Sequence, residues 1–382
     1  MSKETKIIAM YLPQYHQIPE NDRWWGVEGF TDWVSAKNAT PLFNGHIQPK
    51  EPLNDNYYDL SNVDDIRWQA NLAKNYGVYG WGIYHYWFSD DLKLLTKPAE
   101  LILQNKDIDM PFFFAWDNGS WVRTWSKYTH YANTWSPKFD KDTKEKTNVS
   151  EDNGVLAELQ YGNEKNWEYH FNYLLDFFKD DRYIKIDNKP VFIIFNYFQK
   201  EILQTMCTHW RKLAVKAGFS GLYLISRYNI FDSMPGFDGL FTYEPMFSGW
   251  QNKNIVSRIV DKIKEQTNRQ QLKEYDYDKV WQKLLAFARS NKGKDLYHGG
   301  FVHYDDTPRR GENGRIVLKD SAEKFKHYLS ELIDISSEQN KEFVFITAWN
   351  EWGEGAYLEP DKENEFKYLE AIRRIMRREE DN

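Results

Sequence analysis

Two glutamates near the C-terminus, Glu351 and Glu354, have the type and spacing that glycosidic-bond chemistry needs. They lie in the segment TAWNEWGEGA, residues 347–356, directly after an apolar run. In a helical turn, residues three apart bring their Cβ atoms to about 5–6 Å. Cleavage of a glycosidic bond uses two carboxyl groups that flank it, about 5 Å apart when configuration is retained. This spacing predicts a catalytic pair, with two solvated loop glutamates as the alternative.

The neighbours of this pair favour a site over a solvated loop. Trp349 and Trp352 supply apolar walls, which raise the pKa of a nearby carboxyl. Two like charges at close range also move their pKa values apart, so that one carboxyl acts as acid while the other stays ionised. Gly353 and Gly355 permit a sharp turn between and after the two glutamates.

The rest of the chain predicts the frame for this segment, because short apolar runs alternate with segments of helical period. Strands are expected at 7–11, 80–87, 112–116, 190–196, 222–227, 240–244, 300–304 and 343–349. Helices are expected at 64–76, 166–179, 200–217, 277–291, 321–337 and 364–378. The pattern predicts one α/β domain over residues 1–382, a (β/α)8 TIM barrel, with a doubly wound open sheet as runner-up. The short gap between strands five and six leaves a reduced helix there, or none.

Two predicted connections, 33–62 and 118–165, are too long to be simple linkers. A connection of that length without structure counts against an assignment unless it is functional. In a barrel the loops that follow the strands build the active-site face. We therefore expect long βα loops on the face that carries Glu351 and Glu354.

Hydrogen-bonding and aromatic side chains follow most of the predicted strands. Such a ring suits a polyhydroxyl ligand, because sugars combine apolar C–H faces with hydroxyl rims. Each residue alone is more often a packing or capping residue, but the ring as a whole argues for a site. The predicted substrate-binding residues are Tyr11, Gln14, His16, Trp33, His85, Tyr86, Trp87, Trp116, Asp117, Asn118, Trp121, Arg123, Asn196, Arg227, Tyr243, Glu244, Asp305, Arg309, Trp349, Asn350 and Trp352.

Composition and missing motifs narrow the function classes. Aromatic residues make up 17% of the chain, which suits an oligosaccharide or polysaccharide ligand. The net charge is −7, with no basic cluster of the kind that nucleic-acid binding requires. The chain has no Gly-rich phosphate loop, no G-x-S-x-G elbow and no Cys/His metal spacing. We expect neither a metal nor a cofactor.

The sequence also suggests a cytoplasmic location. The apolar run from Ile7 to Leu12 is too short for a signal peptide and far too short to span a bilayer. The single cysteine, Cys207, cannot form an internal disulfide, which fits a reducing compartment. No integral membrane segment is expected.

Several stretches, spread over nearly the whole chain, carry a resemblance to a known family. They are AMYLPQYHQIPENDRWWGVEGFTDW, PLFNGHIQPKEP, GIYHYWF, DDRYIKIDNKPVFIIF, YDDTPRR and TAWNEWGEGAYLEPD. With these motifs the sequence resembles the WbsX-type proteins, a group similar to glycoside hydrolase family 99.

The resemblance implies a barrel that works on glycosidic bonds. WbsX-type proteins are commonly described as glycosyltransferases of surface-polysaccharide synthesis, which includes lipopolysaccharide, and the related hydrolases are retaining endo-α-mannosidases. The E-x-x-E segment of those hydrolases corresponds to Glu351 and Glu354 here. By resemblance, Glu351 is the base on the sugar's 2-hydroxyl, giving a 1,2-anhydro intermediate, and Glu354 is first the acid and then the base.

One stretch departs from the family pattern. WbsX-type proteins usually read W-A-N-E-x-W-T-R after the third strand, whereas residues 116–123 here read WDNGSWVR. Asp117 replaces the usual Ala and Gly119 replaces the usual Glu. If that Glu contacts substrate in relatives, specificity differs in this chain.

Three functions remain open from the sequence. The first is a retaining enzyme that acts on glycosidic bonds with Glu351 and Glu354. The second is a glycosyltransferase of polysaccharide assembly, which the predicted location favours and the missing nucleotide-binding motif disfavours. The third is a non-catalytic glycan-binding barrel, which has no need of two crowded carboxylates.

Overall fold

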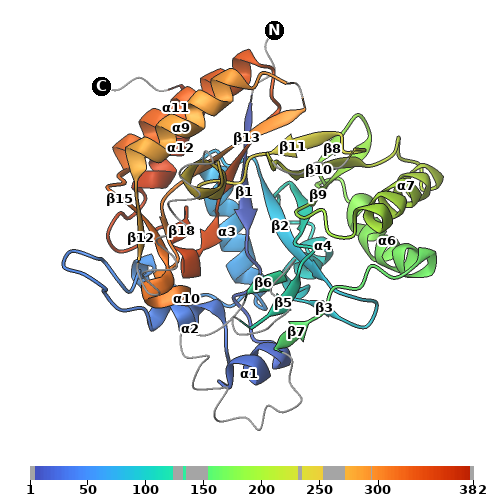
Figure 1. Ribbon diagram of the computed structural model, residues 1–382, viewed down its shortest axis with the longest axis horizontal. Coiled ribbons are helices and arrows are strands. Elements are labelled where there is room, and N and C mark those ends of the chain that lie inside the picture. The colour runs from blue at the N-terminus through green and yellow to red at the C-terminus, as the bar shows by residue number, and fades with distance from the viewer. Residues whose placement is uncertain are drawn as a thin grey trace.

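The centre of the molecule is a closed barrel of eight parallel strands. The computed structural model describes residues 5–123, 132–134, 154–230, 235–252, 272–293 and 295–378. The barrel strands are β1 (Lys6–Tyr11), β2 (Gly80–Trp87), β4 (Phe112–Trp116), β9 (Lys189–Ile194), β10 (Tyr223–Arg227), β11 (Gly239–Phe241), β13 (Leu296–Phe301) and β16 (Phe343–Thr347). They pair in that order, and β1, near the centre of Figure 1, pairs with both β2 and β16. The predicted (β/α)8 barrel is confirmed, and the closure excludes the open sheet.

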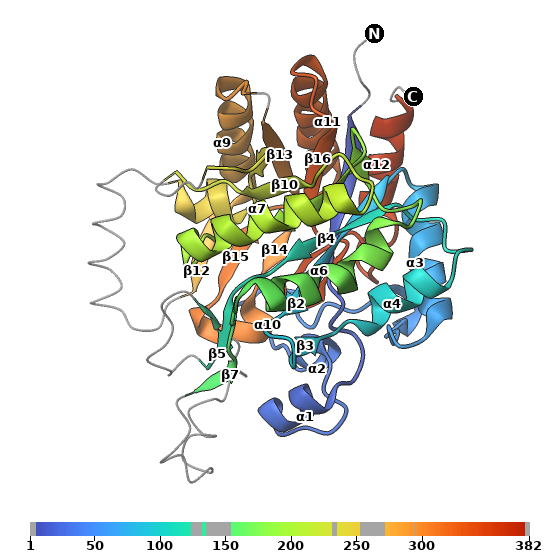
Figure 2. The same cartoon turned by 90° about the vertical axis from the view of Figure 1, so that its right-hand side faces the viewer.

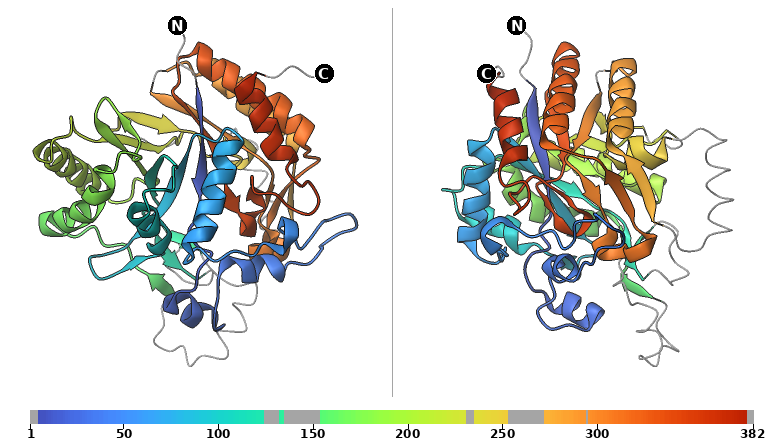
Figure 3. Two further views of the ribbon diagram at one scale, coloured as in Figure 1. Left: turned by 180° about the vertical axis from the view of Figure 1, so that it is seen from behind. Right: turned by 90° about the vertical axis from the view of Figure 1, so that its left-hand side faces the viewer.

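Helices pack around the outside of the barrel (Figures 2 and 3). They are α3 (Val63–Asn75), α4 (Lys97–Gln104), α6 (Glu164–Phe178), α7 (Lys200–Lys216), α9 (Tyr277–Ser290), α11 (Ala322–Glu338) and α12 (Lys367–Arg377). Asn62, Asp276 and Ser321 cap α3, α9 and α11 with side-chain oxygens that accept backbone N–H groups. The sequence predicted six of these helices and missed α4. None of the described helices is long and apolar enough to cross a membrane.

The seventh strand lies earlier in the chain than expected. The prediction placed it at 300–304, whereas β13 spans Leu296–Phe301. The pair Gly299-Gly300 lies inside the strand, where a Cβ at Gly299 would come within 2.0 Å of the Thr242 carbonyl. Gly299 thus marks a close approach of the backbone that follows β11, and Gly300 a close approach of the Ile346 and Trp281 side chains, rather than the start of a strand.

Phenylalanines fill much of the barrel interior. The Phe241 ring lies 5.3 Å from Phe345 and 5.6 Å from Phe195, and Phe113 lies 6.1 Å from Phe345. Gly82 makes room for this layer, because a Cβ there would lie 3.1 Å from the Phe113 ring. Part of the aromatic excess therefore belongs to the core.

The long connections form added structure at the carboxyl end of the barrel strands (Figure 2). After β1 come α1 (Pro19–Trp25), α2 (Asp32–Lys37) and the turn η1 (Leu53–Asp55). After β4 come β5 (Ser120–Val122), β6 (Ala132–Thr134) and β7 (Val155–Ala157). Other short elements are β3 (Lys93–Leu94), β8 (Lys185–Ile186), the π-helical turn η2 (Phe247–Gln251), β12 (Lys273–Asp276), β14 (Tyr304–Asp305), α10 (Thr307–Arg310), η3 (Gly311–Asn313), β15 (Arg315–Leu318), β17 (Asn350–Glu351), η4 (Trp352–Glu354) and β18 (Ala356–Tyr357). Long βα loops are thus present on the face where they were expected.

Candidate active site

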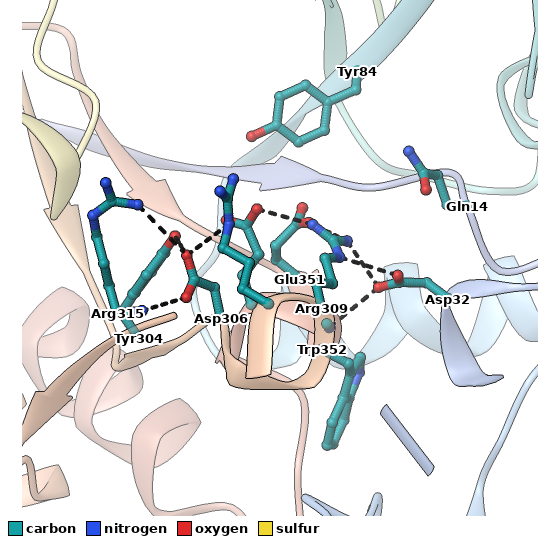
Figure 4. A network of polar contacts seen from close by, with 12 residues as sticks. Gln14, Asp32, Tyr84, Tyr304, Asp306, Arg309, Arg315, Glu351 and Trp352 are labelled. Carbon is teal, nitrogen blue, oxygen red and sulfur yellow. Dashed lines mark hydrogen bonds and ion pairs between the residues drawn. The ribbon is translucent and has the colours of Figure 1, made fainter. Parts of the chain in front are cut away.

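Arg309 brings three carboxylates together at the carboxyl end of the barrel. It lies on α10, and its side chain is only 13% exposed. Its Nη2 lies 2.8 Å from Glu351 Oε1 and 2.9 Å from Asp32 Oδ2, and its Nη1 lies 2.9 Å from Glu354 Oε1 (Figure 4). A planar guanidinium presents five donors on three nitrogens in a rigid fork, whereas a lysine presents three donors on a single nitrogen. The structure thus joins the predicted pair Glu351 and Glu354 in one network.

A close backbone approach at Gly353 shapes this network. Gly353 lies between the two glutamates in the turn η4, and its N–H donates to Asp32 Oδ2 at 3.1 Å. A Cβ at this position would lie 2.5 Å from both Asp32 Oδ2 and Arg309 Nε. Only glycine therefore lets the turn come so near to the ion pair.

Replacing Gly353 by alanine is expected to destabilise the protein by about 1–3 kcal/mol, because the added methyl group pushes Arg309 away from Asp32. Urea unfolding measures the change. Gly293→Ala is the matched control, because a Cβ there meets nothing within 4 Å. Equal stabilities of the two variants would contradict the close approach at Gly353.

The segment after β1 is bonded to the turn that carries the glutamates. Tyr15 donates its hydroxyl proton to the Asn350 carbonyl at 2.7 Å and accepts from the Trp352 N–H at 3.0 Å. The Asn350 side chain accepts from the Leu12 N–H at 2.7 Å and donates to the Leu12 carbonyl at 3.0 Å. Asn350 and Tyr15 therefore fix the turn that positions Glu351.

Burial gives Glu351 an unusual titration. Its side chain is 5% exposed, and this burial raises the pKa of the carboxyl from 4.5 to about 8. The charge of Arg309 lowers the pKa, while Glu354 and Asp32 raise it. The effect of burial thus exceeds that of Arg309, and the ionised Glu351 carboxylate is a stronger base than an ordinary carboxylate.

Replacing Glu351 by glutamine is expected to stabilise the protein, and more so at higher pH. Between pH 4.5 and 8 the folded state holds a proton on Glu351 that the unfolded state has lost, so stability falls as pH rises. Glutamine removes this penalty, so the variant gains about 2 kcal/mol or more by pH 8. Urea unfolding at pH 5, 6.5 and 8 measures it, and a difference that does not grow with pH would contradict the raised pKa.

Two tyrosines form a floor beneath the network. Tyr84 comes from β2 and Tyr243 follows β11, and their hydroxyl oxygens lie 2.7 Å apart. These two strands stand on opposite sides of the barrel, so the hydrogen bond crosses its mouth. Both rings pack on Phe195, at 5.7 and 5.5 Å, above the phenylalanine layer. Figure 4 shows Tyr84 on the barrel side of the Arg309 network.

Further predicted residues lie around this floor. Gln14 donates to the Tyr86 hydroxyl at 3.3 Å, and Trp121 packs edge-on against the Tyr86 ring at 5.0 Å. On the side of β10, Arg227 donates to Asn196 Oδ1 at 2.9 Å. Asp117 and Tyr243 are within electrostatic range of Arg227. The structure therefore brings part of the predicted set together around the two tyrosines, and their role in binding substrate stays a prediction.

Other predicted residues point outward, into the helical shell. His85 Nε2 lies 2.8 Å from His170 Nε2 on α6, and the Trp87 ring stacks on His170 at 4.1 Å. Trp116 donates its Nε1 proton to the Trp87 carbonyl and packs on Trp210 of α7. Successive side chains of a strand alternate between faces, so Tyr84 and Tyr86 face inward while their neighbours do not. His85, Trp87 and Trp116 do not line the mouth.

A last group of predicted residues holds loops and turns in place. Each makes a contact within the protein that accounts for its position. The hydrogen bonds join Tyr11 to Gln69, Trp33 to the Tyr58 carbonyl, Asn118 to Asn196, Arg123 to the Trp24 carbonyl, Glu244 to Ser248, Asp305 to His46 and Gln48, and Trp352 to Glu359. The ring contacts join Trp349 to Trp81 and Trp352 to Tyr357. His16 is buried, and burial lowers its pKa. Burial also raises the pKa of Glu244 to about 7.

Asp32 and Asp306 are the acidic residues that the sequence prediction missed. Asp32 is 4% exposed and accepts hydrogen bonds from both Nε and Nη2 of Arg309. Asp306 is fully buried, accepts the Tyr304 hydroxyl at 3.2 Å, and has its pKa raised to about 6 by burial (Figure 4). Both lie in stretches that carry the family resemblance, GFTDW and YDDTPRR, and that was the available signal.

The described residues offer no cluster that could hold a metal ion. No group of three His, Cys, Asp or Glu side chains has that arrangement in this part of the chain. Two histidines of barrel strands or the loops after them also lie apart: His85 contacts His170, whereas His303 contacts the Gly355 carbonyl. They therefore do not converge on one site.

Comparison with known proteins settles the family. Residues 7–372 match the family model described as Glycosyltransferase WbsX. The chain belongs to this family. Two relatives from strains of Xanthomonas campestris pv. campestris, both described as uncharacterized protein WxcX, are 28% and 29% identical over 98% of the chain. This member of the WbsX family spans about half the length of those relatives.

Solved structures resemble this WbsX-family chain in fold. A GH99 endo-alpha-mannosidase from Bacteroides thetaiotaomicron has a TM-score of 0.58 at 14% identity, covering 97% of this chain and 96% of its own. A glycoside hydrolase-like protein has a TM-score of 0.58 at 13% identity, with 98% and 94% covered. At such identities the likeness shows the fold alone, and it agrees with the closed barrel.

Proposed function

We propose that this chain acts on glycosidic bonds by a retaining mechanism, with Glu351 and Glu354 as its catalytic pair. The observation that carries the proposal is the Arg309 network, which holds both carboxyls on neighbouring nitrogens of one guanidinium. Retaining chemistry needs two carboxyl groups close together that titrate differently. The surroundings of the two carboxyls differ, because the Glu351 side chain is 5% exposed and the Glu354 side chain is 23% exposed.

The two glutamates take different roles in this proposal. Ionised Glu351 removes the proton from the sugar's 2-hydroxyl, and that oxygen attacks C1 to form a 1,2-anhydro sugar. Glu354, whose side chain is 23% exposed, gives its proton to the departing glycosidic oxygen. Glu354 then takes a proton from water, which opens the anhydro ring at C1, and Glu351 returns its proton to the 2-oxygen. Two inversions at C1 give overall retention.

The surroundings support a sugar as the ligand. The hydroxyls of Tyr84 and Tyr243 are hydrogen-bonded to each other above an aromatic layer, and we call this pair the tyrosine bridge. Trp121 and Tyr86 add aromatic faces near Gln14. Aromatic faces with polar rims suit sugar rings. α-Linked mannosides are the first substrates to test, because a protein of similar fold is an endo-alpha-mannosidase.

A glycosyltransferase is the second candidate, and the description of the family favours it. In that case a sugar hydroxyl replaces water in the second step, and the same two glutamates serve. Whether the enzyme makes or breaks a glycosidic bond then depends on the sugar donor that it uses.

One incubation series tests these alternatives. Wild-type protein and the double variant Glu351→Gln/Glu354→Gln are given α-mannan oligosaccharides and surface-polysaccharide oligosaccharides, with and without acceptor sugars and nucleotide sugars. We expect glycan cleavage or lengthening by the wild type alone. Equal glycan binding by both proteins, without turnover of any substrate, would contradict the proposal and favour a binding barrel.

A further inference from the structure

Arg227 is a cation at the mouth of the barrel. It ends β10 and is half-buried. Its Nη2 donates to the neutral amide oxygen of Asn196 at 2.9 Å, and its Nη1 lies 3.6 Å from the Met246 sulfur. Across the described parts of the chain, no carboxylate comes within ion-pair distance of it. A guanidinium has five N–H donors, so most of this capacity remains for a ligand.

The contrast with Arg309 shows what Arg227 lacks. Arg309 is neutralised by three carboxylates in direct contact. Among the described residues, Asp117 is the carboxylate within electrostatic range of Arg227, and it lies beyond ion-pair distance. Burial lowers the pKa of the Arg227 guanidinium, but an arginine keeps its proton at neutral pH. A charge withdrawn from water in this way is stabilised when an anion binds it.

The protein holds Arg227 in position before any ligand arrives. The Tyr197 hydroxyl donates to the Arg227 carbonyl at 3.1 Å. Asn196, which accepts from the guanidinium, is itself fixed by Asn118, because its N–H donates to Asn118 Oδ1 at 2.7 Å and its carbonyl accepts from Asn118 Nδ2 at 2.8 Å. A preorganised fork loses little side-chain entropy on binding.

Arg227 and the catalytic pair face each other over the same floor. Tyr84 and Tyr243 are within electrostatic range of Arg227, and both are also within range of Glu351. In the barrel, β10 is separated from β16, which leads to Glu351, by β11 and β13. The mouth therefore has an acidic side at Glu351 and a basic side at Arg227, with the tyrosine bridge on its floor.

We propose that Arg227 binds a negatively charged group of the glycan, a carboxylate or a phosphate, in the subsite next to Glu351 and Glu354. The guanidinium fork matches the two oxygens of either group. The acidic side repels the same group, so the charge also fixes the direction in which the glycan lies. This inference rests on the proposed function for the identity of the ligand as a sugar, and it adds the class of sugar: acidic or phosphorylated.

Binding without turnover tests the inference. Titration calorimetry on the full chain compares methyl α-mannopyranoside with methyl α-mannopyranosiduronate, methyl α-mannopyranoside 6-phosphate and α-mannosyl phosphate, together with the gluco and galacto series. We expect at least one anionic sugar to bind about ten- to a hundredfold more tightly than its neutral parent, the range of a charge-assisted hydrogen bond. The separate probes distinguish a uronic acid from a phosphate.

The variants decide whether Arg227 causes the preference. Arg227→Gln is expected to reduce the anion preference to about onefold, and Arg227→Lys to keep part of it. Arg211→Gln, which removes a cation paired with Asp238 outside the mouth, is the matched control. If Arg227→Gln does not fold, as judged by thermal unfolding, the Lys variant alone must show a reduced preference.

Two results would overturn the inference. One is the lack of any anion preference above about twofold in the wild type, in all three sugar series. The other is a preference that persists unchanged in the Arg227 variants. The result of a hydrolysis assay is independent of this binding preference. If the protein cleaves no glycan but prefers anionic sugars through Arg227, the proposed function is wrong and the Arg227 site still stands.

Discussion

Replacing Glu354 by glutamine is expected to lower kcat/KM, which reports the bond-breaking step, by about 10³-fold on glycosides with poor leaving groups, because a positioned general acid contributes about 10²–10⁴-fold. The loss is expected to be much smaller on a glycosyl fluoride, whose leaving group needs less protonation. Steady-state kinetics on an aryl glycoside, an oligosaccharide and a fluoride measure the difference. This dependence on the leaving group is what distinguishes the acid from a residue that only binds sugar.

Two further glutamate variants serve as references for that experiment. Glu351→Gln is expected to slow all three substrates alike, because the 2-hydroxyl must lose its proton whatever group leaves. Glu363→Gln alters a surface glutamate beside Lys50, and its kinetics are expected to match the wild type. An equal loss on all substrates in Glu354→Gln would contradict the role of Glu354 as acid.

Replacing Arg309 by lysine is expected to cost about 2–3 kcal/mol of stability and at least about 10²-fold in kcat. A lysine is a point charge and cannot reach Asp32, Glu351 and Glu354 together, so at least one buried carboxylate loses its partner. The stability cost follows from that uncompensated charge, and the kinetic cost follows from the lost position of the glutamates. Urea unfolding and steady-state kinetics measure the two effects.

The neighbouring arginine is the matched control. Arg310 lies on the same short helix and pairs through Nε with Asp306 at 3.1 Å, with 43% of its side chain exposed. One exposed cation beside one carboxylate can be replaced by lysine, so Arg310→Lys is expected to cost less than about 1 kcal/mol. If the Lys variants at 309 and 310 behaved alike, the network would not depend on the guanidinium fork.

The barrel could be predicted because its strands are nearly continuous apolar runs between helices of clear period. Val191 to Ile194 is such a run, and every residue in it is fully buried. The seventh strand was misplaced because its glycine pair resembles a turn, whereas Gly299 packs closely against Thr242 and Gly300 against Ile346 and Trp281. Glycine is typical both of turns and of places where another part of the chain comes very close to the backbone.

The site could be predicted only where it is local in sequence. Glu351 and Glu354 lie three residues apart in one turn, so spacing alone brought them together. Asp32 joins them from the loop after β1, and the spacing of residues around it does not identify its partner Arg309, which is 277 residues away in the sequence. Its place became visible only when β1 and β16 were found side by side.

The sequence also did not show which side chains of a strand face the barrel interior. Tyr84, His85, Tyr86 and Trp87 are all aromatic or polar, so composition does not say which of them face the mouth. The structure places Tyr84 and Tyr86 inward and the other two against α6. Strands that are buried on both faces lack the polar alternation that would have shown this.

The most direct test of the account is the anomeric configuration of the first product, followed by proton NMR during cleavage of an α-mannoside or of whichever glycan proves to be the substrate. The account predicts that the first-formed sugar keeps the configuration of the substrate, and that Glu351→Gln/Glu354→Gln forms no product. An inverted first product, or turnover by the double variant near the wild-type rate, would contradict a retaining mechanism at Glu351 and Glu354.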